Sequence, residues 1–300
     1  MAQTTRLEKA IAGKAFLITA EVMPPKGPDM VAFIEKASLL KDRVHAINVT
    51  DSNRAVMRMS PLAASALLVQ VGLEPICQLA CRDRNRIALQ GDLIGAEALG
   101  IHNILALTGD PVDCGDHPRA RAVCDLESVR LLQVIDGLNR GVDSAGNALN
   151  AQTHLFAGAA IDPQSGSESG LRSRFRRKVE AGARFFQSQL ITDFKRLGWF
   201  MDNIACEYER PVLAGVFLLK SAKNALYINR NLPGVTIPEA IIERLERAGA
   251  QAQQEGIVIA AEQVAAARQI CDGVHLMAIR REEVIPEILD RAGVAALTSF

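Results

Sequence analysis

The chain has 300 residues, 49% of them hydrophobic, and its 34 Lys and Arg residues balance its 34 Asp and Glu residues. Such a chain can bury a large core, and no Pro-, Ser- or Gly-rich linker divides it, so we expect one catalytic domain over residues 1–300. The charge balance argues against a nucleic-acid-binding surface. Because we find no signal-peptide pattern and no apolar run near the roughly 20 residues of a membrane span, we expect a cytoplasmic protein with no membrane partner.

Eight short apolar runs along the chain are suited to buried parallel strands. In order they are Phe16–Val22, Val44–Thr50, Glu74–Leu79, Ile101–Leu107, His154–Ala160, Phe185–Leu190, Val212–Leu219 and Gly273–Ile279. Helical patterns lie between them, at about 29–40, 60–71, 83–100, 126–138, 171–181, 194–207, 221–229, 238–248 and 260–270. Asp83 is placed to cap the third of these helices and Gly100 to end it.

Eight strands, each followed by a helix, predict a single (β/α)8 barrel, the TIM barrel, at this chain length. A doubly wound open sheet is the competing topology. It ranks lower because the strand count reaches eight and no Gly-x-Gly-x-x-Gly motif opens a helix. In a parallel barrel the carboxyl ends of all strands meet at one mouth, which is where active sites form.

Polar residues stand where several of these strands end: Glu21, Thr50, Gln78, Asp110, Gln189 and Lys220. Glu21 follows an apolar strand and precedes Pro24 and Pro25, so its carboxyl group could hold a proton near neutral pH and act as a general acid. An ion pair with a nearby Arg is an equally good reading of Glu21. Asp110 follows Gly109, which permits close approach to a planar ligand, although a turn cap is the alternative.

A basic cluster lies at the start of the helix expected between strands five and six: Arg172, Arg174, Arg176, Arg177 and Lys178. Such a run is usually a solvated face, but here it follows a polar loop, residues 163–170, so phosphate binding is a real alternative. Gln189 can donate and accept hydrogen bonds toward a heterocycle, or can hold a loop. Lys220 could form a Schiff base, although a lysine with its amine in solvent is commoner.

Metal and disulfide chemistry have little support in the sequence. The six cysteines form no Cys-x-x-Cys pair, which argues against a zinc ribbon or a dithiol redox site. The histidines at 45, 102, 117, 154 and 275 are scattered, and no His-x-His lies near the first strand, so we expect no metal centre.

Six segments in chain order together resemble the methylenetetrahydrofolate reductase family of barrel flavoproteins. They are Ala20–Lys26, Ile47–Asp51, Cys81–Arg86, Ala106–Pro111, Arg177–Ala183 and Gly234–Pro238. The segment from Gly115 to Leu126 is similar to that of the short, single-domain bacterial members. The resemblance covers nearly the whole chain, and it is specific because the segments occur in order and at strand ends.

The resemblance implies reduction of 5,10-methylenetetrahydrofolate to 5-methyltetrahydrofolate, with FAD as hydride carrier and NADH or NADPH as donor. Glu21 would protonate the folate, and Asp110 would lie near the flavin and the pterin. The resemblance places Thr50, Gln78 and Gly109 in the flavin site. It assigns Arg177 and Lys178 to the flavin diphosphate and Gln189 to the pterin. Because barrels of this kind often pair through their outer helices, we also expect a homo-oligomer.

Three positions depart from the family pattern: Gln78 replaces a histidine, Gly158 begins a segment without the usual aromatic and imidazole contacts, and Ala222 replaces a phenylalanine. Three alternatives therefore stay open. Hydride could pass directly from the nicotinamide to the folate without a flavin. The protein could instead be a lyase or aldolase that uses Lys220, or a non-catalytic folate-binding subunit.

Overall fold

The computed structural model describes residues 4–232 and 234–297, and in it eight parallel strands close into a barrel in chain order. The strands are β1 (Leu17–Val22), β2 (Ala46–Val49), β3 (Pro75–Ala80), β4 (Asn103–Leu107), β5 (Phe156–Ile161), β6 (Phe185–Leu190), β7 (Val212–Phe217) and β8 (Gly273–Met277). β1 pairs with β2 on one side and with β8 on the other, which closes the ring. The expected (β/α)8 barrel is therefore confirmed.

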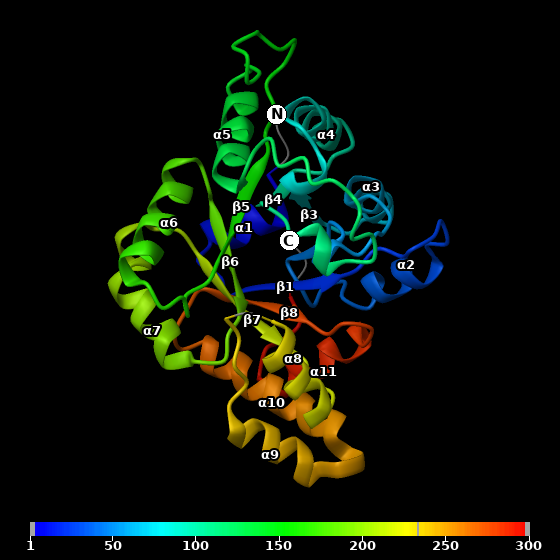
Figure 1. The fold of residues 1–300 in the computed structure, drawn as a ribbon, viewed down its shortest axis with the longest axis vertical. Helices are drawn as coiled ribbons and strands as arrows, with labels where there is room; N and C mark the ends of the chain where they lie inside the picture. Colours follow the sequence, from blue (N-terminus) through cyan, green and yellow to red (C-terminus); the bar gives the residue numbers. More distant parts are fainter. Residues whose placement is uncertain (1–3, 233, 298–300) are drawn as a thin grey trace.

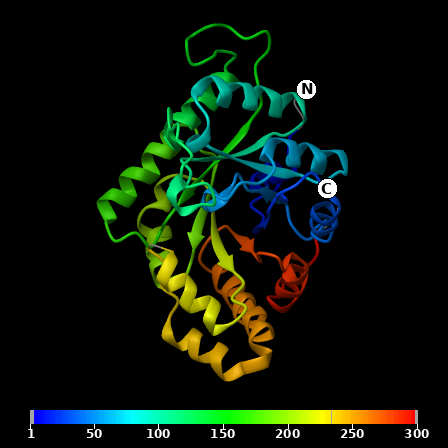
Figure 2. The same ribbon diagram turned by 45° about the vertical axis from the view of Figure 1, so that its right-hand side comes forward.

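Helices ring the strands, as Figure 1 shows in a view along the barrel. They are α1 (Arg6–Ala12), α2 (Val31–Ser38), α3 (Pro61–Gln70), α4 (Arg86–Ala98), α5 (Ser128–Asn139), α6 (Glu168–Glu180), α7 (Phe194–Asn203), α8 (Ala222–Asn231), α9 (Glu239–Ala248), α10 (Ala252–Ala267) and α11 (Ile285–Arg291). The segment that follows α5 projects beyond this ring in both ribbon views (Figure 2). In the described part of the chain, no helix is both long and apolar enough to cross a membrane.

Helix α1 was not expected from the sequence, although its start carries a recognisable signal. The side chain of Thr5 accepts a hydrogen bond from the backbone N–H of Glu8, and the carboxylate of Glu8 accepts one from the N–H of Thr5. This reciprocal pair is a capping box, which satisfies N–H groups that the first helical turn leaves without partners. α11 was also missed, and α10 starts eight residues earlier than the expected segment at 260–270.

The N-terminal cap of α4 is Asn85 and not Asp83. The Asn85 side chain accepts hydrogen bonds from the N–H groups of Ile87 and Ala88, whereas the Asp83 carboxylate binds the guanidinium of Arg82. At the other end the helix stops at Ala98, and Gly100 adopts φ +77°, a conformation that glycine takes without strain. The expected end of the helix is therefore confirmed, and its expected cap is wrong.

Alternation along each strand decides what fills the barrel. In β1, Ile18, Ala20 and Val22 pack outward against the helices, so Leu17, Thr19 and Glu21 point inward. The lowest inward layer is apolar and consists of Leu17, Ala46, Ile76, Leu105, Phe156, Phe185 and Leu213. The inward positions above this layer are largely polar, and they lead to the mouth.

Candidate functional site

Four polar side chains form a connected layer inside the barrel, directly above the apolar one. Nδ2 of Asn48 donates to Oε1 of Gln187 at 2.7 Å, and Nε2 of Gln187 donates to Oδ1 of Asn48 and to Oγ1 of Thr19, both at 3.0 Å. Oγ1 of Thr19 in turn lies 3.0 Å from Nδ1 of His275. All four residues are buried, so hydrogen bonds within the layer replace those that water would otherwise make.

Glu21 lies one inward position above Thr19, near the mouth. Its Oε2 is 3.8 Å from Nε2 of His275, and the two side chains are only 11% and 5% exposed. Among the described residues, Glu21 makes no ion pair with a lysine or arginine and no side-chain hydrogen bond. The alternative reading of Glu21, a pair with a neighbouring arginine, therefore has no counterpart in the described part of the structure.

Thr50, Gln78 and Gln189 also lie at the mouth, at or near the ends of β2, β3 and β6. Oγ1 of Thr50 is buried and has no hydrogen-bond partner among the residues that the structure describes. Within residues 4–232 and 234–297, the side chains of Gln78 and Gln189 make no hydrogen bond either. Buried polar groups are nearly always paired, so the hydroxyl of Thr50 is an exception that lies at the mouth end of the barrel.

Asp110 lies three residues beyond the end of β4, so it stands at the same end of the barrel as Glu21. Its Oδ2 accepts a hydrogen bond of 2.6 Å from the backbone N–H of Arg54, in the loop after β2. Gly109 has φ +94°, and a Cβ atom there would lie 2.8 Å from Cβ of Arg82. Only glycine fits this turn, which leads the chain to Asp110.

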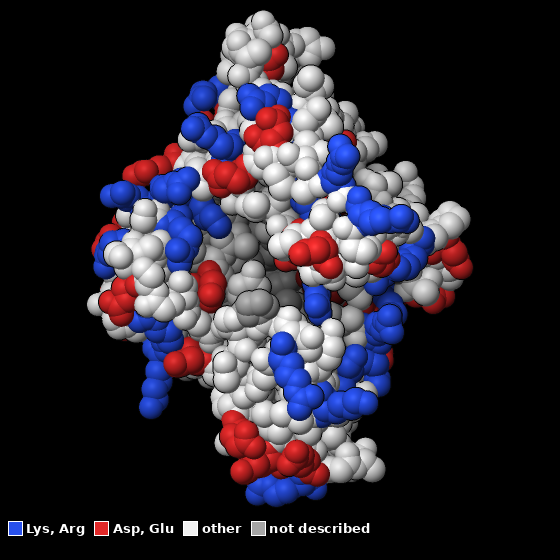
Figure 3. Space-filling model, in the orientation of Figure 1, with Lys and Arg blue, Asp and Glu red and all other residues white. Residues whose placement is uncertain are grey.

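The basic residues of α6 lie differently from the sequence interpretation. Because α6 begins at Glu168, Arg177 and Lys178 fall in its last turn and not near its start. Nζ of Lys178 donates to the carbonyl oxygen of Ala160 at 2.6 Å, and burial lowers the pKa of this amine. Arg177 is exposed, 3.8 Å from the carboxylate of Glu127. Lys and Arg side chains gather over α6 beside the central hollow in Figure 3.

Lys220 follows β7 by three residues, and its Nζ donates to the carbonyl oxygen of Ile279 at 3.3 Å. No feature of the described structure favours Schiff-base chemistry at this amine over that hydrogen bond. In the described residues, no three His, Cys, Asp or Glu side chains come together as a metal site.

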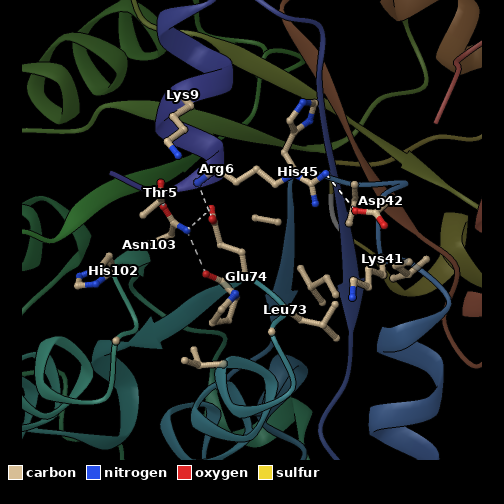
Figure 4. Close-up of a pocket in the computed structure, with 18 of the residues that line it drawn as sticks. Thr5, Arg6, Lys9, Lys41, Asp42, His45, Leu73, Glu74, His102 and Asn103 are labelled. Carbon is tan, nitrogen blue, oxygen red and sulfur yellow. Dashed lines mark hydrogen bonds and ion pairs between the residues drawn. The ribbon is translucent and has the colours of Figure 1, made fainter. Parts of the chain in front are cut away.

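A cavity of about 510 Å³ lies at the opposite end of the barrel, where the strands begin (Figure 4). Beside it the carboxylate of Glu74 accepts hydrogen bonds from the N–H groups of Arg6 and Leu7 and from Nδ2 of Asn103. These bonds fix α1 across the base of the barrel. A second hollow, of about 570 Å³, lies beside the start of α7 and includes Gln164 and Thr192.

His275, Thr19, Asn48 and Gln187 were not among the expected site residues. A single histidine far from other candidate residues does not by itself indicate a functional site. The three other residues have the pattern of ordinary strand positions. The usable signal was alternation. Thr19 stands two residues before Glu21 in the same strand, so both side chains point to the same face of the sheet.

The chain is similar to known proteins along nearly its whole length. The chain matches the sequence model of the family described as methylenetetrahydrofolate reductase over residues 6–293. It is 23% identical over 309 residues to a Caenorhabditis elegans protein named "Probable methylenetetrahydrofolate reductase (NADPH)", an alignment that covers 96% of this chain and 44% of that protein. The chain thus spans less than half the length of this curated relative.

Solved structures share the fold at low sequence identity. A Clostridium thermocellum protein described as binding two copies of 5-methyl-5,6,7,8-tetrahydrofolic acid has a TM-score of 0.62 and 14% identity, over 96% of this chain and 98% of that one. Tryptophan synthase from Mycobacterium tuberculosis has a TM-score of 0.55 and 13% identity, over 97% of this chain and 100% of that one. At these identities the likeness shows the barrel fold alone.

Proposed function

The chain belongs to the methylenetetrahydrofolate reductase family, and on that premise we propose that it reduces 5,10-methylenetetrahydrofolate to 5-methyltetrahydrofolate with NADH or NADPH as hydride donor. The observation that carries this proposal is the set of unpaired polar side chains at the mouth. The buried hydroxyl of Thr50 has no partner in the described part of the chain, and the carboxyl group of Glu21 lies near the same opening. A substrate with a polar heterocycle would supply the missing hydrogen bonds.

Glu21 supplies the proton in the proposed reaction. The methylene group of the substrate bridges two folate nitrogens, and a proton given to one of them breaks its bond to the bridging carbon. The carbon that remains on the other nitrogen is an iminium, which accepts the hydride and becomes the methyl group. One proton and one hydride are consumed in each turnover, so the acid and the hydride donor have separate roles.

Asp110 and Gln189 would bind the pterin in this proposal. The carboxylate of Asp110 accepts hydrogen bonds, and the amide of Gln189 both donates and accepts them, so together they match the mixed edge of a pterin ring. The side chain of Gln189 makes no hydrogen bond with the described residues and is exposed at the mouth. Oδ1 of Asp110 has no hydrogen-bond donor among the described residues, and that oxygen can accept from a ligand.

FAD is the proposed hydride carrier between the nicotinamide and the folate. The unpaired Oγ1 of Thr50, the amide of Gln78 and the turn at Gly109 fit the heterocyclic end of such a group. Arg177 and Lys178 would hold its diphosphate, since both carry positive charge beside the mouth side of α6 and β5. Lys178 would exchange its hydrogen bond to the carbonyl of Ala160 for one to a phosphate oxygen.

Direct hydride transfer without a flavin is the second candidate. It is favoured by the hydrogen bond to the carbonyl oxygen of Ala160 that already occupies the Lys178 amine. The absorption spectrum of the purified protein distinguishes the two candidates. A flavin band that NADH bleaches and methylenetetrahydrofolate restores supports the first, and folate reduction by a colourless protein supports the second.

Replacement of Thr50 by valine tests whether the mouth binds the folate or its hydride carrier. Because Oγ1 of Thr50 bonds to none of the described residues, T50V should leave the free energy of unfolding unchanged or raise it, yet weaken ligand binding. Thr153 is the matched control, since its Oγ1 donates to Oδ1 of Asn139 at 2.6 Å far from the mouth. T153V should cost about 1 kcal/mol of stability and leave ligand binding unchanged. The mouth is not the binding site if T50V binds 5-methyltetrahydrofolate and retains flavin as the parent protein does.

A further inference from the structure

We propose that His275 is a positioning residue for Glu21, which it faces through Nε2–H, and that it stabilises the carboxylate left on Glu21 after the proton has passed to the folate. The inference rests on the proposed function, because it assigns a partner to the proposed general acid. The 3.8 Å separation of Nε2 and Oε2 is the contact from which it starts.

Hydrogen bonds in the polar layer decide which ring nitrogen carries the proton. Oγ1 of Thr19 accepts from Nε2 of Gln187, so its single hydrogen is free to be donated. Two acceptors are available to it, Nδ1 of His275 at 3.0 Å and the carbonyl oxygen of Val274 at 3.4 Å. The shorter contact favours donation to Nδ1. A neutral ring that accepts at Nδ1 carries its proton on Nε2, which is the nitrogen that faces Glu21.

The layer beneath fixes the orientation of the imidazole ring. Gln187 is held at both ends of its amide by Asn48, so the group that donates to Thr19 cannot turn away without breaking two further hydrogen bonds. Asn48, Thr19 and Gln187 are each nearly or fully buried, and water does not compete for their hydrogen bonds. A chain of three residues from β2, β6 and β1 therefore holds the ring on β8 in one position.

The charge that appears on Glu21 during the reaction explains the need for such a partner. Glu21 and His275 are largely buried, and a new carboxylate there loses much of the solvation it would have in water. An N–H dipole or an imidazolium aimed at that oxygen stabilises the charge at the moment it forms. The neighbours of His275 in the sheet are Thr19 and Gly215, so Glu21 is the titratable side chain that faces it in the described structure.

Two substitutions of His275 distinguish the roles of its two ring nitrogens. The amide oxygen of asparagine lies two bonds from Cβ, as Nδ1 does, and can accept the hydrogen bond from Thr19, but the asparagine side chain is too short to reach Glu21. The amide nitrogen of glutamine lies three bonds from Cβ, as Nε2 does, and can present an N–H to Glu21. H275N should lower kcat for folate reduction by about 10- to 100-fold with KM for the folate within about twofold, whereas H275Q should retain most of kcat.

The solvent deuterium isotope effect on kcat distinguishes a role in proton transfer from a merely structural role, because a structural role would leave it unchanged. If His275 stabilises the product of proton transfer, H275N makes that transfer slower, and the isotope effect on kcat should increase. H45N is the matched control, because His45 is also a buried histidine whose Nδ1 accepts a hydrogen bond, from the N–H of Ile18, but at the other end of the barrel. H45N should leave the isotope effect as it is in the parent protein.

Failure of this inference can be told apart from failure of the proposed function. Full turnover in H275N together with a large loss in E21Q overturns the role of His275 alone, and full turnover in E21Q overturns the general-acid proposal. Equal losses of kcat in H275N and H275Q, with no change in the isotope effect, would show that His275 has only a structural role. Side-chain ¹⁵N NMR of the five histidines provides an independent check. A His275 ring protonated only at Nδ1 would contradict the proposed orientation.

Discussion

The backbone N–H of Arg54 donates a hydrogen bond of 2.6 Å to Oδ2 of Asp110, which joins the loop after β2 to the loop after β4 across the mouth. Ser52 and Arg54 have φ values of 46° and 52°, in the left-handed region that residues other than glycine rarely adopt. Such a conformation costs on the order of 1 kcal/mol per residue and persists only where neighbouring contacts enforce it. Asp110 therefore has a structural role in addition to the one proposed for it toward the pterin.

Two substitutions of Asp110 should separate these roles. D110N keeps an oxygen that accepts from Arg54 but removes the charge, so the loop stays in place and folate turnover falls. D110A removes both, so the amide hydrogen of Arg54 should also exchange with solvent about tenfold faster or more. Hydrogen exchange measured beside turnover distinguishes the two effects. Equal protection of Arg54 in D110A and in the parent protein would show that the hydrogen bond does not hold the loop.

Asp116 ties three loops of the mouth together. Its carboxylate binds the amine of Lys26 and accepts from the backbone N–H of Met57, and these two contacts, with that of His117, hold its pKa well below the usual range. A lowered pKa means that the ionised form is favoured in the folded state, so the tie is present at neutral pH and is lost as the pH falls through this low value. Loop 111–124 should resist proteolysis equally from about pH 8 down to about pH 5.

The matching variant is D116N, which keeps the shape of the side chain and loses its charge. Without the ion pair to Lys26, loop 111–124 should be cleaved faster than in the parent protein over the whole of that pH range. Cleavage that is equally slow in D116N would mean that the loop is held by other contacts. Wild-type cleavage that rises steeply near neutral pH would contradict the sign of the pKa shift.

His45 should make folding stability depend on pH. Burial, followed by the positive charge of Arg6, lowers the pKa of His45 from 6.5 to about 4. Between pH 4 and pH 6.5 the unfolded chain therefore binds a proton at His45 that the folded chain does not. The contribution of the neutral His45 to the free energy of unfolding is fully present above pH 6.5 and falls as the pH drops toward 4. The loss is on the order of 1–3 kcal/mol. Urea unfolding at several pH values measures it, and H45N should lose this part of the pH dependence.

Two glycine-to-alanine substitutions should change stability in opposite directions. A Cβ atom at Gly158 would overlap the ring of Phe185, which is fully buried and stacks on Phe156 with 5.7 Å between centroids. G158A should therefore cost about 1–3 kcal/mol through overpacking. Gly91 lies on the exposed side of α4 with open space around it, and G91A should gain about 0.5–1 kcal/mol from helix propensity. Thermal unfolding of both variants tests the packing of the barrel interior.

Strand periodicity and strand-end position made the fold and the mouth predictable from sequence. Each apolar run of β1 to β8 is short and is followed by a helical pattern, and few topologies other than a closed barrel accommodate eight such units. Glu21, Thr50 and Gln78 were expected at the mouth for the same reason. That expectation needed only the direction of each strand, which the chain order supplies.

What could not be predicted depends on contacts between residues far apart in the chain. The approach of His275 to Glu21 spans almost the whole sequence, and no local pattern encodes it. The hydrogen bond from Lys178 to the carbonyl oxygen of Ala160 was not predicted either, because it joins a helix side chain to a strand 18 residues earlier. The division of the chain, one domain over residues 1–300, remains a prediction.

The role of Glu21 as the proton donor is the central claim, and turnover of E21Q tests it most directly. Glutamine keeps the size of the side chain and removes the acid, so methylenetetrahydrofolate reduction should fall by about 10²- to 10⁴-fold. Oxidation of NADH by an artificial electron acceptor needs no proton from Glu21 and should stay within about twofold of the parent rate. Folate reduction by E21Q at the parent rate would contradict the account.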